Sequence, residues 1–489
     1  MREEKLKASS ITKNFIFNSL LTISNMVFPI ITFPYVSRIL GPEGTGKVEF
    51  ATSIVYYFNM FAQLGIPTYG IKICAKVRDD REQLSRITQE LLILNILMAT
   101  ISYIALYMCL LFIPKFAEEK TLLFFISSTI FLSAVGMEWL YKGLEKYMYI
   151  TIRSVIFKFI ALIAMFALIH SKTDYVLYGC ITVFASSASY VTNFLYAKNY
   201  IDFKRRKLEF RYHLKPILIF LAMAIASTIY TNLDIMMLGF MKTTKEVGVY
   251  NAAIKIRKLL LGFVTALSTV ILPRASYYIE HKELNKFYNI AKKAFKFVTI
   301  ISLGISIYFI LFAKEGIMFL SGKEYSGSII PMQIIMPTLF LVGLTNISGI
   351  QMLIPLGKEN IVLYSEIAGA IVDIIVNMIL IPKYASVGAA IGTLMAEIFV
   401  LLVQFFCIKK DIKKIFKGFN WWIIILSLFI SSMISLIIKF LNISSNFLIL
   451  VFSSCIFFTI YFLMLNVFKE PLICKIEKDI IIKIRNKLL

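Results

Sequence analysis

Long apolar segments recur along the whole chain, and they constrain the fold more than any other feature of the sequence. Each holds about 20 residues, the length of helix that crosses the ~30 Å hydrocarbon core of a bilayer. Because these segments lack the alternation of barrel strands, they predict membrane-spanning helices. Fourteen such segments are expected, with both ends of each uncertain by several residues: 14–36, 48–70, 87–113, 121–141, 151–170, 175–197, 216–240, 250–272, 294–313, 329–355, 360–381, 385–408, 420–440 and 445–468.

Composition agrees with an all-α integral membrane protein. The 489 residues are 58% hydrophobic, above the roughly 45–50% of soluble domains, and the mean hydropathy is +0.78. The basic start MREEKLK leads into an apolar run too long for a cleavable signal, so it is expected to stay as the first helix. The six cysteines form no CxxC pair, and the three histidines lack metal-ligand spacing, so neither a disulfide framework nor a metal site is indicated.

The distribution of basic residues predicts the orientation. Of 52 Lys and Arg, 37 lie in segments that are internal if the N-terminus is internal, and ten lie in outer loops. This asymmetry follows the positive-inside rule and places both termini in the cytoplasm. The net charge of +23 is therefore read as an orientation signal in contact with membrane lipids, and not as a nucleic-acid surface.

One motif points elsewhere at first sight. GPEGTGKV, residues 41–48, matches the start of a phosphate-binding loop, but Val48 stands where such a loop needs the Ser or Thr that holds magnesium. The segment follows a membrane span and is expected on the outer side, away from cytoplasmic ATP. Its glycines are expected to form a tight reversal between two helices.

The longest hydrophilic connection divides the spans into six before and eight after. This predicts an N-terminal six-helix lobe (1–200), a basic cytoplasmic linker (201–215), a second six-helix lobe (216–408) and a terminal helix pair with a basic tail (409–489). A faint internal repeat supports two lobes of parallel topology: GKVEFA at 46–51 is echoed by GVYNAA at 248–253, each at the expected outer turn between two helices.

Four stretches resemble Wzx-type polysaccharide repeat-unit flippases of the multidrug and polysaccharide exporter (MOP, MATE-like) superfamily. They are residues 33–80, which begin FPYVSRILGPEGTG, and residues 138–158, 231–256 and 377–397. The resemblance implies two lobes around a central cavity that opens alternately to each side. It also implies transport of an undecaprenyl-pyrophosphate-linked oligosaccharide from the inner to the outer leaflet of the bacterial cytoplasmic membrane, for O-antigen, capsule or related polymers.

Partners and coupling follow from the same resemblance. A polysaccharide polymerase and chain-length proteins are possible partners, no cofactor is indicated, and a coupling ion, proton or sodium, stays open. Three alternatives also stay open: an ion-coupled multidrug exporter, a flippase for a teichuronic acid or peptidoglycan precursor, and a membrane-embedded polymerase or ligase. The absence of a large outer loop with histidine disfavours the enzyme.

Charged residues within the expected spans are the site candidates, because a buried charge costs about 2.5–3.5 kcal/mol on insertion scales and tends to face water or a partner. The substrate-binding candidates are cations that could hold pyrophosphate: Arg38, Lys158, Lys255 and Arg257. The coupling or cavity-lining candidates are Asp234, Glu366, Asp373, Asn377 and Glu397. Asp234 could pair with Lys255 or Arg257 in a purely structural role, Arg38 and Lys158 could instead snorkel to the interface, and the stripe Glu366, Asp373 and Asn377 shares one helical face.

Overall fold

The computed structural model describes residues 11–204, 207–441 and 443–474. In these ranges the chain forms helices and no strand, so the predicted all-α fold is confirmed. The basic N-terminal residues and the end of the basic tail, which contribute to the orientation prediction, lie outside the described residues. The chain divides into two compact units, residues 1–248 and 249–489.

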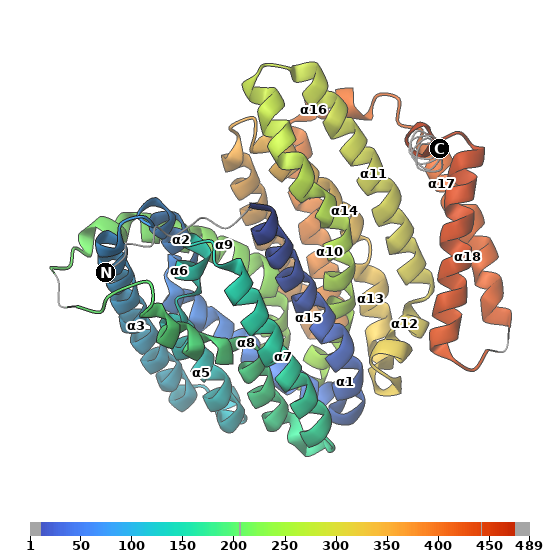
Figure 1. Ribbon diagram of the computed structural model, residues 1–489. Helices are drawn as coiled ribbons and strands as arrows, with labels where there is room; N and C mark the ends of the chain where they lie inside the picture. The colour runs from blue at the N-terminus through green and yellow to red at the C-terminus, as the bar shows by residue number, and fades with distance from the viewer. Residues whose placement is uncertain (1–10, 205–206, 442, 475–489) are drawn as a thin grey trace, which may run out of the picture. The chain divides into compact units, whose positions relative to one another are not determined.

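Within the described residues, the first unit holds nine α-helices and a 3-10 turn. Most of these helices are labelled in Figure 1. Their bounds are α1 Ile11–Gln63, α2 Ile66–Lys76, α3 Arg81–Phe112, α4 Pro114–Ala117, α5 Lys120–Gly136, α6 Glu138–Gly143, α7 Tyr147–Leu168, the 3-10 turn Lys172–Asp174, α8 Tyr175–Ala197 and α9 Arg211–Met241. Helix α5 packs against α1, α3 and α8, while α7 packs against α1 and α8. Helix α9 packs against α1 and α2. The division into two six-helix lobes with a linker at 201–215 stays a prediction.

The GPEGTGKV segment forms a kink at one residue, in place of the expected tight reversal between two helices. Within α1 only Gly41 leaves helical geometry, with φ 67° and ψ −179°. Positive φ is a conformation that glycine adopts without a steric penalty, so this one residue joins two helical arms. The first arm runs over 11–40 and the second over 42–63.

The glycines after this kink permit close packing. A Cβ atom on Gly46 would lie 1.7 Å from the carbonyl oxygen of Thr244, and a Cβ on Gly248 would lie 1.8 Å from that of Pro42. The contact is reciprocal, since each glycine meets the residue four positions before the other. The two segments that echo each other in sequence therefore pack against each other, which only residues without a side chain allow.

The end of the first unit where α2, α3 and α9 meet has a polar core. Nε2 of His213 lies 2.7 Å from a carboxylate oxygen of Glu90, and Nδ1 lies 2.7 Å from the hydroxyl of Tyr69. Arg86 donates to the same carboxylate at 3.1 Å. Buried polar groups are stable when they are hydrogen-bonded. This network links the start of α9 to α2 and α3.

The second unit contains most of α10 and the helices after it. Their bounds are α10 Thr244–Glu280, α11 Leu284–Leu311, α12 Ala313–Leu320, the 3-10 helix Lys323–Ser328, α13 Ile329–Ile335, α14 Thr338–Asn346, the π-helix Ile347–Leu353, α15 Glu359–Cys407, α16 Lys409–Phe416, α17 Trp421–Leu436, the 3-10 helix Ile437–Phe440 and α18 Asn446–Val467. Helix α11 contacts α13, α14, α16, α17 and α18. It is thus central to the packing of this unit.

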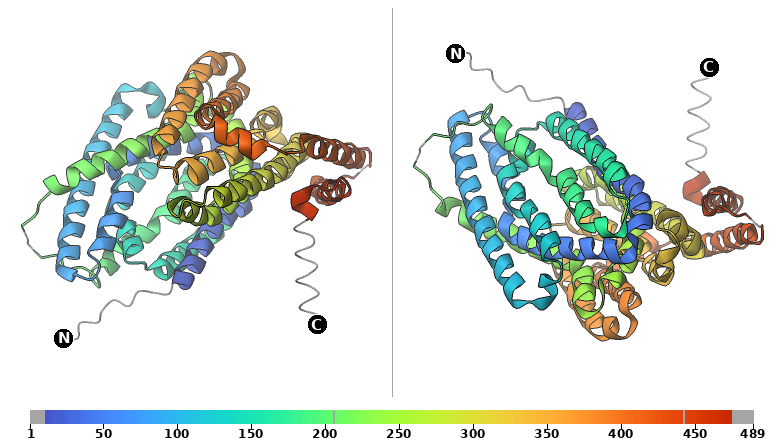
Figure 2. Two further views of the ribbon diagram at one scale, coloured as in Figure 1. Left: turned by 90° about the horizontal axis from the view of Figure 1, so that it is seen from above. Right: turned by 90° about the horizontal axis from the view of Figure 1, so that it is seen from below.

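Helix α15 is broken once, at Ala385, with φ 48° and ψ −125°. A Cβ on Gly388 would lie 2.5 Å from the carbonyl oxygen of Leu380, so the chain is tightly packed at this break. The two arms correspond to the expected spans 360–381 and 385–408. Helices α17 and α18 lie side by side near the C-terminal end (Figure 2).

The number of spans depends on how broken helices are treated. Every expected apolar segment falls mainly on helix. Within the described residues, eight helices are long and apolar enough to cross a membrane, or nine if the bent pair Lys323–Ile335 and Thr338–Leu353 is one span. Helix α5 is shorter, at 17 residues. A multi-pass fold is therefore confirmed, whereas the exact number of fourteen is not.

Candidate functional site

Helix α7 carries two cations in an otherwise apolar stretch. Arg153 is only 6% exposed, and Lys158 is half-buried. Cations are costly within a membrane span, so each calls for a compensating partner. The partners of these two residues decide what α7 can bind.

Lys158 is held by neutral groups on the first arm of α1. Its ammonium donates to the hydroxyl of Ser24 at 3.1 Å and to the side-chain oxygen of Asn25. These contacts provide acceptors for the N–H groups of the ammonium, but they add no negative charge. The positive charge of Lys158 is therefore solvated and not neutralised.

Arg153 has weaker support. Its closest carboxylate oxygen belongs to Glu138 and lies 3.8 Å away, which is beyond hydrogen-bond distance. The other oxygen of Glu138 pairs with Lys142 at 2.8 Å, so one carboxylate serves two cations. None of the three guanidinium nitrogens has a hydrogen-bond partner among the described residues. A buried charge in this condition is an unusual cost for a fold to carry.

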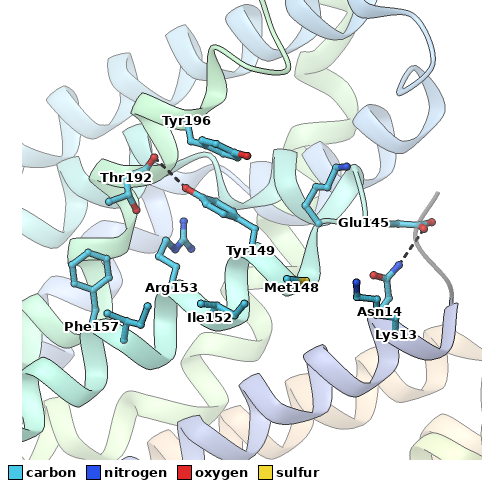
Figure 3. Close-up of a pocket in the computed structure, with 12 residues that line it drawn as sticks. Lys13, Asn14, Glu145, Met148, Tyr149, Ile152, Arg153, Phe157, Thr192 and Tyr196 are labelled. Carbon is cyan, nitrogen blue, oxygen red and sulfur yellow. Dashed lines mark hydrogen bonds between the residues drawn. The ribbon is translucent and has the colours of Figure 1, made fainter. Parts of the chain in front are cut away.

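A cavity of about 700 Å³ adjoins Arg153, and Lys158 is not among the residues that line it. It lies between the start of α1, the first half of α7 and the end of α8, and its lining includes Lys13 and Arg153 (Figure 3). Lys146 also lines it. The single carboxylate in the lining, Glu145, pairs with Arg78 at 2.9 Å. Among the residues described around it, the cavity therefore has an excess of positive charge.

Tyrosines border the same cavity. Tyr149 and Tyr196 are stacked with ring centroids 4.6 Å apart, and the hydroxyl of Tyr149 donates to the carbonyl oxygen of Thr192 at 3.2 Å (Figure 3). The Tyr149 ring lies 5.2 Å from the guanidinium carbon of Arg153, within range of a cation–π contact. Burial raises the pKa of the neighbouring Tyr200 to about 12. Tyr200 is therefore neutral at physiological pH and does not offset the cations.

The second unit brings two predicted residues together in a different way. Arg257 on α10 donates to Glu397 on α15 at 2.8 Å and to the hydroxyl of Thr338 at 2.6 Å. The side chains of Arg257 and Glu397 are 12% and 5% exposed. Arg257 was predicted to bind substrate and Glu397 to line a cavity; here they form a shielded ion pair.

Three further candidates lie elsewhere on α1, α9 and α10. Arg38 is exposed and donates back to the carbonyl oxygen of Pro34 in its own helix. Asp234 on α9 and Lys255 on α10 are half-buried. Their predicted roles in binding or coupling stay predictions.

The three residues of the predicted polar stripe on α15 differ in burial. Asp373 is 2% exposed and Asn377 is fully buried, whereas Glu366 is half-buried. A Cβ on Gly392 would lie 2.1 Å from the side-chain oxygen of Asn377 and 3.1 Å from an oxygen of Asp373. The two arms of α15 thus meet at these polar groups, which favours the interpretation of polar contacts between helices.

Arg153 is the site residue that the sequence analysis did not single out. The expected span began at residue 151, which put Arg153 in its first turn and made it one more positive-inside residue. Helix α7 begins at Tyr147, so Arg153 lies nearly two turns inside. The sequence feature that could have identified Arg153 is a second cation, Lys158, five residues later in the same apolar helix.

These features define a class: a multi-pass helical membrane protein with a cavity lined mainly by cations among its charged residues in one unit and a neutralised ion pair in the other. The family model described as "Polysaccharide biosynthesis protein" matches residues 11–279. The chain belongs to this family.

Individual relatives agree. A "Putative O-antigen transporter" of Escherichia coli (strain K12) is 24% identical over 414 residues, which cover 82% of this chain and 97% of the relative. Among solved structures, the lipid II flippase MurJ in an inward closed conformation has a TM-score of 0.73 at 16% identity, covering 94% of this chain and 100% of that one. An inward-facing MATE family transporter of the MOP superfamily has a TM-score of 0.58 at 15% identity, covering 83% and 100%. At these identities the structures show a shared fold.

Proposed function

We propose that the protein moves undecaprenyl-pyrophosphate-linked oligosaccharide repeat units from the inner to the outer leaflet of the bacterial cytoplasmic membrane by alternating access. At a coarser level it is a flippase for polysaccharide biosynthesis and not an enzyme, as the family and the transporter relatives indicate. The polysaccharide polymerase and chain-length proteins are proposed partners downstream.

One observation supports the substrate: among the described residues, the buried Arg153 has no hydrogen-bond partner and the half-buried Lys158 has neutral ones. An anion would supply the charge that the protein does not. Pyrophosphate at the junction of lipid and sugar is such an anion, and the planar guanidinium of Arg153 can bind it with two parallel hydrogen bonds. Lys158 adds a second positive charge five residues along the same helix.

The tyrosines suggest how the cation is protected when no substrate is bound. The guanidinium nitrogens of Arg153 are covered in this structure, and the Tyr149 ring lies beside them. We propose that this ring turns away when the anion enters. The exchange replaces a cation–π contact by charge-assisted hydrogen bonds, which are stronger.

The other predicted residues enter the proposal in a second role. Asp373 and Asn377 offer a buried carboxylate and a buried amide on one helix face, a composition suited to binding a coupling proton or sodium ion. Glu366 and Asp234 are half-buried carboxylates of the same kind. Arg38 and Lys255 stay candidate cations for the anion's path, whereas Arg257 is neutralised by Glu397.

A cationic-drug exporter is the alternative with the same fold. Such a protein would be expected to present carboxylates to its substrate, whereas the cavity beside α7 is lined by three cations and by one carboxylate that is already paired. The α7 cavity therefore favours an anionic substrate.

The test is complementation of a flippase-null strain that makes the matching lipid-linked repeat unit. We expect Arg153→Ala and Lys158→Ala to reduce surface polysaccharide and to accumulate lipid-linked repeat units at normal protein level. Lys314→Ala is the control, because Lys314 is an exposed cation on the short helix α12. Full export by the Arg153→Ala, Lys158→Ala double variant would contradict the proposal.

A further inference from the structure

The second arm of α1 carries a polar stripe that the proposed anion site does not use. Thr52, Tyr56, Asn59 and Gln63 are separated by four, three and four residues, so they share one face of the helix. This arm belongs to a candidate membrane span. Polar side chains within a span face protein or a water-filled space. We call these four residues the polar face of α1.

Two cavities border the polar face. One, of about 400 Å³, lies among α1, α2 and α9 and is lined by Tyr56, Asn59 and Gln63. The other, of about 230 Å³, lies among α1, α5 and α8 and is lined by Thr52, Tyr56 and Asn59. Because both include Tyr56 and Asn59, they adjoin along one side of the helix. The larger one reaches the volume range of small-molecule sites, roughly 300–1,000 Å³.

The chemistry of the smaller cavity is that of hydroxyl groups. Thr129, Thr182 and Ser186 line it and donate their hydroxyl protons to carbonyl oxygens of their own helices, at 2.8, 2.9 and 3.0 Å. A hydroxyl that donates in this way keeps its lone pairs as acceptors. The wall therefore accepts hydrogen bonds from whatever occupies the space.

Donors come from the polar face itself. Gln63 donates to Ser133 at 2.7 Å, and Ser133 donates to the side-chain oxygen of Asn59 at 2.7 Å. This chain fixes the amide of Asn59 and leaves its NH₂ group for another acceptor. Tyr56 is 48% exposed, and within the described part of the chain no hydrogen bond involves its hydroxyl. The face thus offers donors and acceptors together, with an aromatic ring beside them.

Charge is what distinguishes these two cavities from the one beside α7. Among the described residues that line them, none is charged. A phosphate would find no cation there, and a dehydrated metal ion would find no carboxylate in a space much larger than itself. A neutral molecule with many hydroxyl groups fits the mixture of donors, acceptors and aromatic surface.

We propose that the polar face of α1 binds the sugar part of the transported molecule, while the α7 cations bind its pyrophosphate. This inference rests on the proposed function and adds a glycan-recognition site to it. Tyr56 and Asn59 border both cavities, so they contact the sugar wherever it lies along the face. They are therefore the residues that distinguish a glycosylated lipid from the bare lipid.

The experiment compares the binding of two probes to the full chain in lipid nanodiscs. One probe is undecaprenyl pyrophosphate without sugar, and the other is the lipid-linked repeat-unit pool extracted from a flippase-null strain. We expect wild type to bind the glycosylated probe about tenfold more tightly, a factor that one or two net hydrogen bonds can provide. Tyr56→Phe and Asn59→Leu should each reduce this preference, and the double variant should abolish it without changing the affinity for the bare lipid.

Two controls separate this inference from the proposed function. Tyr107→Phe removes a hydroxyl from a 60% exposed tyrosine on α3 that lines neither cavity, and it should keep the preference. Arg153→Ala should weaken both probes equally. If wild type prefers neither probe, or if the Tyr56 and Asn59 variants keep the preference, the glycan site is overturned while the flippase proposal stands. If neither probe binds wild type, the proposed function fails and the glycan site fails with it.

Discussion

Two buried arginines, one in each unit, have opposite surroundings. Arg257 in the second unit has a carboxylate at 2.8 Å and a hydroxyl at 2.6 Å, so its charge is neutralised within the protein. Among the described residues, Arg153 in the first unit has a shared carboxylate at 3.8 Å and a tyrosine ring at 5.2 Å, and no hydrogen-bond partner. The comparison teaches that position within a span does not reveal the role of a charge; its partners do.

The largest expected effect concerns the neutralised pair. Removing Glu397 alone leaves the Arg257 charge buried and unpaired, which typically costs about 3–5 kcal/mol. We therefore expect Glu397→Leu to lower the free energy of unfolding by about that amount, measured by denaturant unfolding of the purified protein. The double variant Arg257→Met, Glu397→Leu should recover most of the loss, because it removes both charges. If Glu397→Leu leaves the free energy of unfolding unchanged, the pair does not stabilise the fold.

The corresponding change in the first unit should separate transport from stability. Arg153 has no hydrogen bond to lose among the described residues, so Arg153→Met should leave the free energy of unfolding unchanged or raise it. Transport should fall at least about tenfold, since a bidentate charge-assisted contact is lost. Surface glycan and thermal stability, measured on the same variant, test both parts. A strongly destabilised Arg153→Met protein would mean that the residue is structural.

A smaller effect is expected for Lys158. Lys158→Met removes hydrogen bonds to Ser24 and Asn25 together with the cost of burying the ammonium. These contributions oppose each other, so stability should change by less than about 1 kcal/mol. Transport should decline less than for Arg153, because a lysine binds phosphate as a point charge. Equal transport by Lys158→Met and wild type would restrict the anion site to Arg153.

The smallest effect is expected at Tyr149, whose ring lies beside Arg153. Tyr149→Phe keeps the aromatic ring and removes the hydrogen bond to Thr192, which is worth about 0.5–1.5 kcal/mol. Transport should stay within about twofold of wild type, whereas Tyr149→Ala should increase access to Arg153. Initial rates of export distinguish the two variants. A Tyr149→Phe protein without transport would show that the hydroxyl, and not the ring, acts in the site.

The fold was more accessible from the sequence than the site. Apolar length determines where helices cross a membrane, so the expected spans fall on helices. The kink was harder to predict, because Gly41 replaces a whole expected loop through one residue at positive φ. The echo between the segments at Gly46 and Gly248 was visible in the sequence, but their mutual contact was not.

The site depends on tertiary contacts that no local pattern contains. Arg257 and Glu397 are 140 residues apart, and their pairing follows from the packing of α10 and α15. The sequence places Arg153 in the first turn of a span that begins at residue 151, whereas α7 begins four residues earlier, at Tyr147. Lys158 was predicted correctly as a charge within a span, yet its neutral partners on α1 became visible only in the structure.

The central claim is that the α7 cations bind the substrate anion and that the Arg257–Glu397 pair stabilises the fold. The most direct measurement is equilibrium binding of sugar-free undecaprenyl pyrophosphate to the full chain in nanodiscs. The claim predicts that Arg153→Met weakens binding at least about tenfold, while Arg257→Met, Glu397→Leu binds like wild type. Unchanged binding by Arg153→Met, together with lost binding by the folded double variant, would contradict the claim and assign the anion to the second unit.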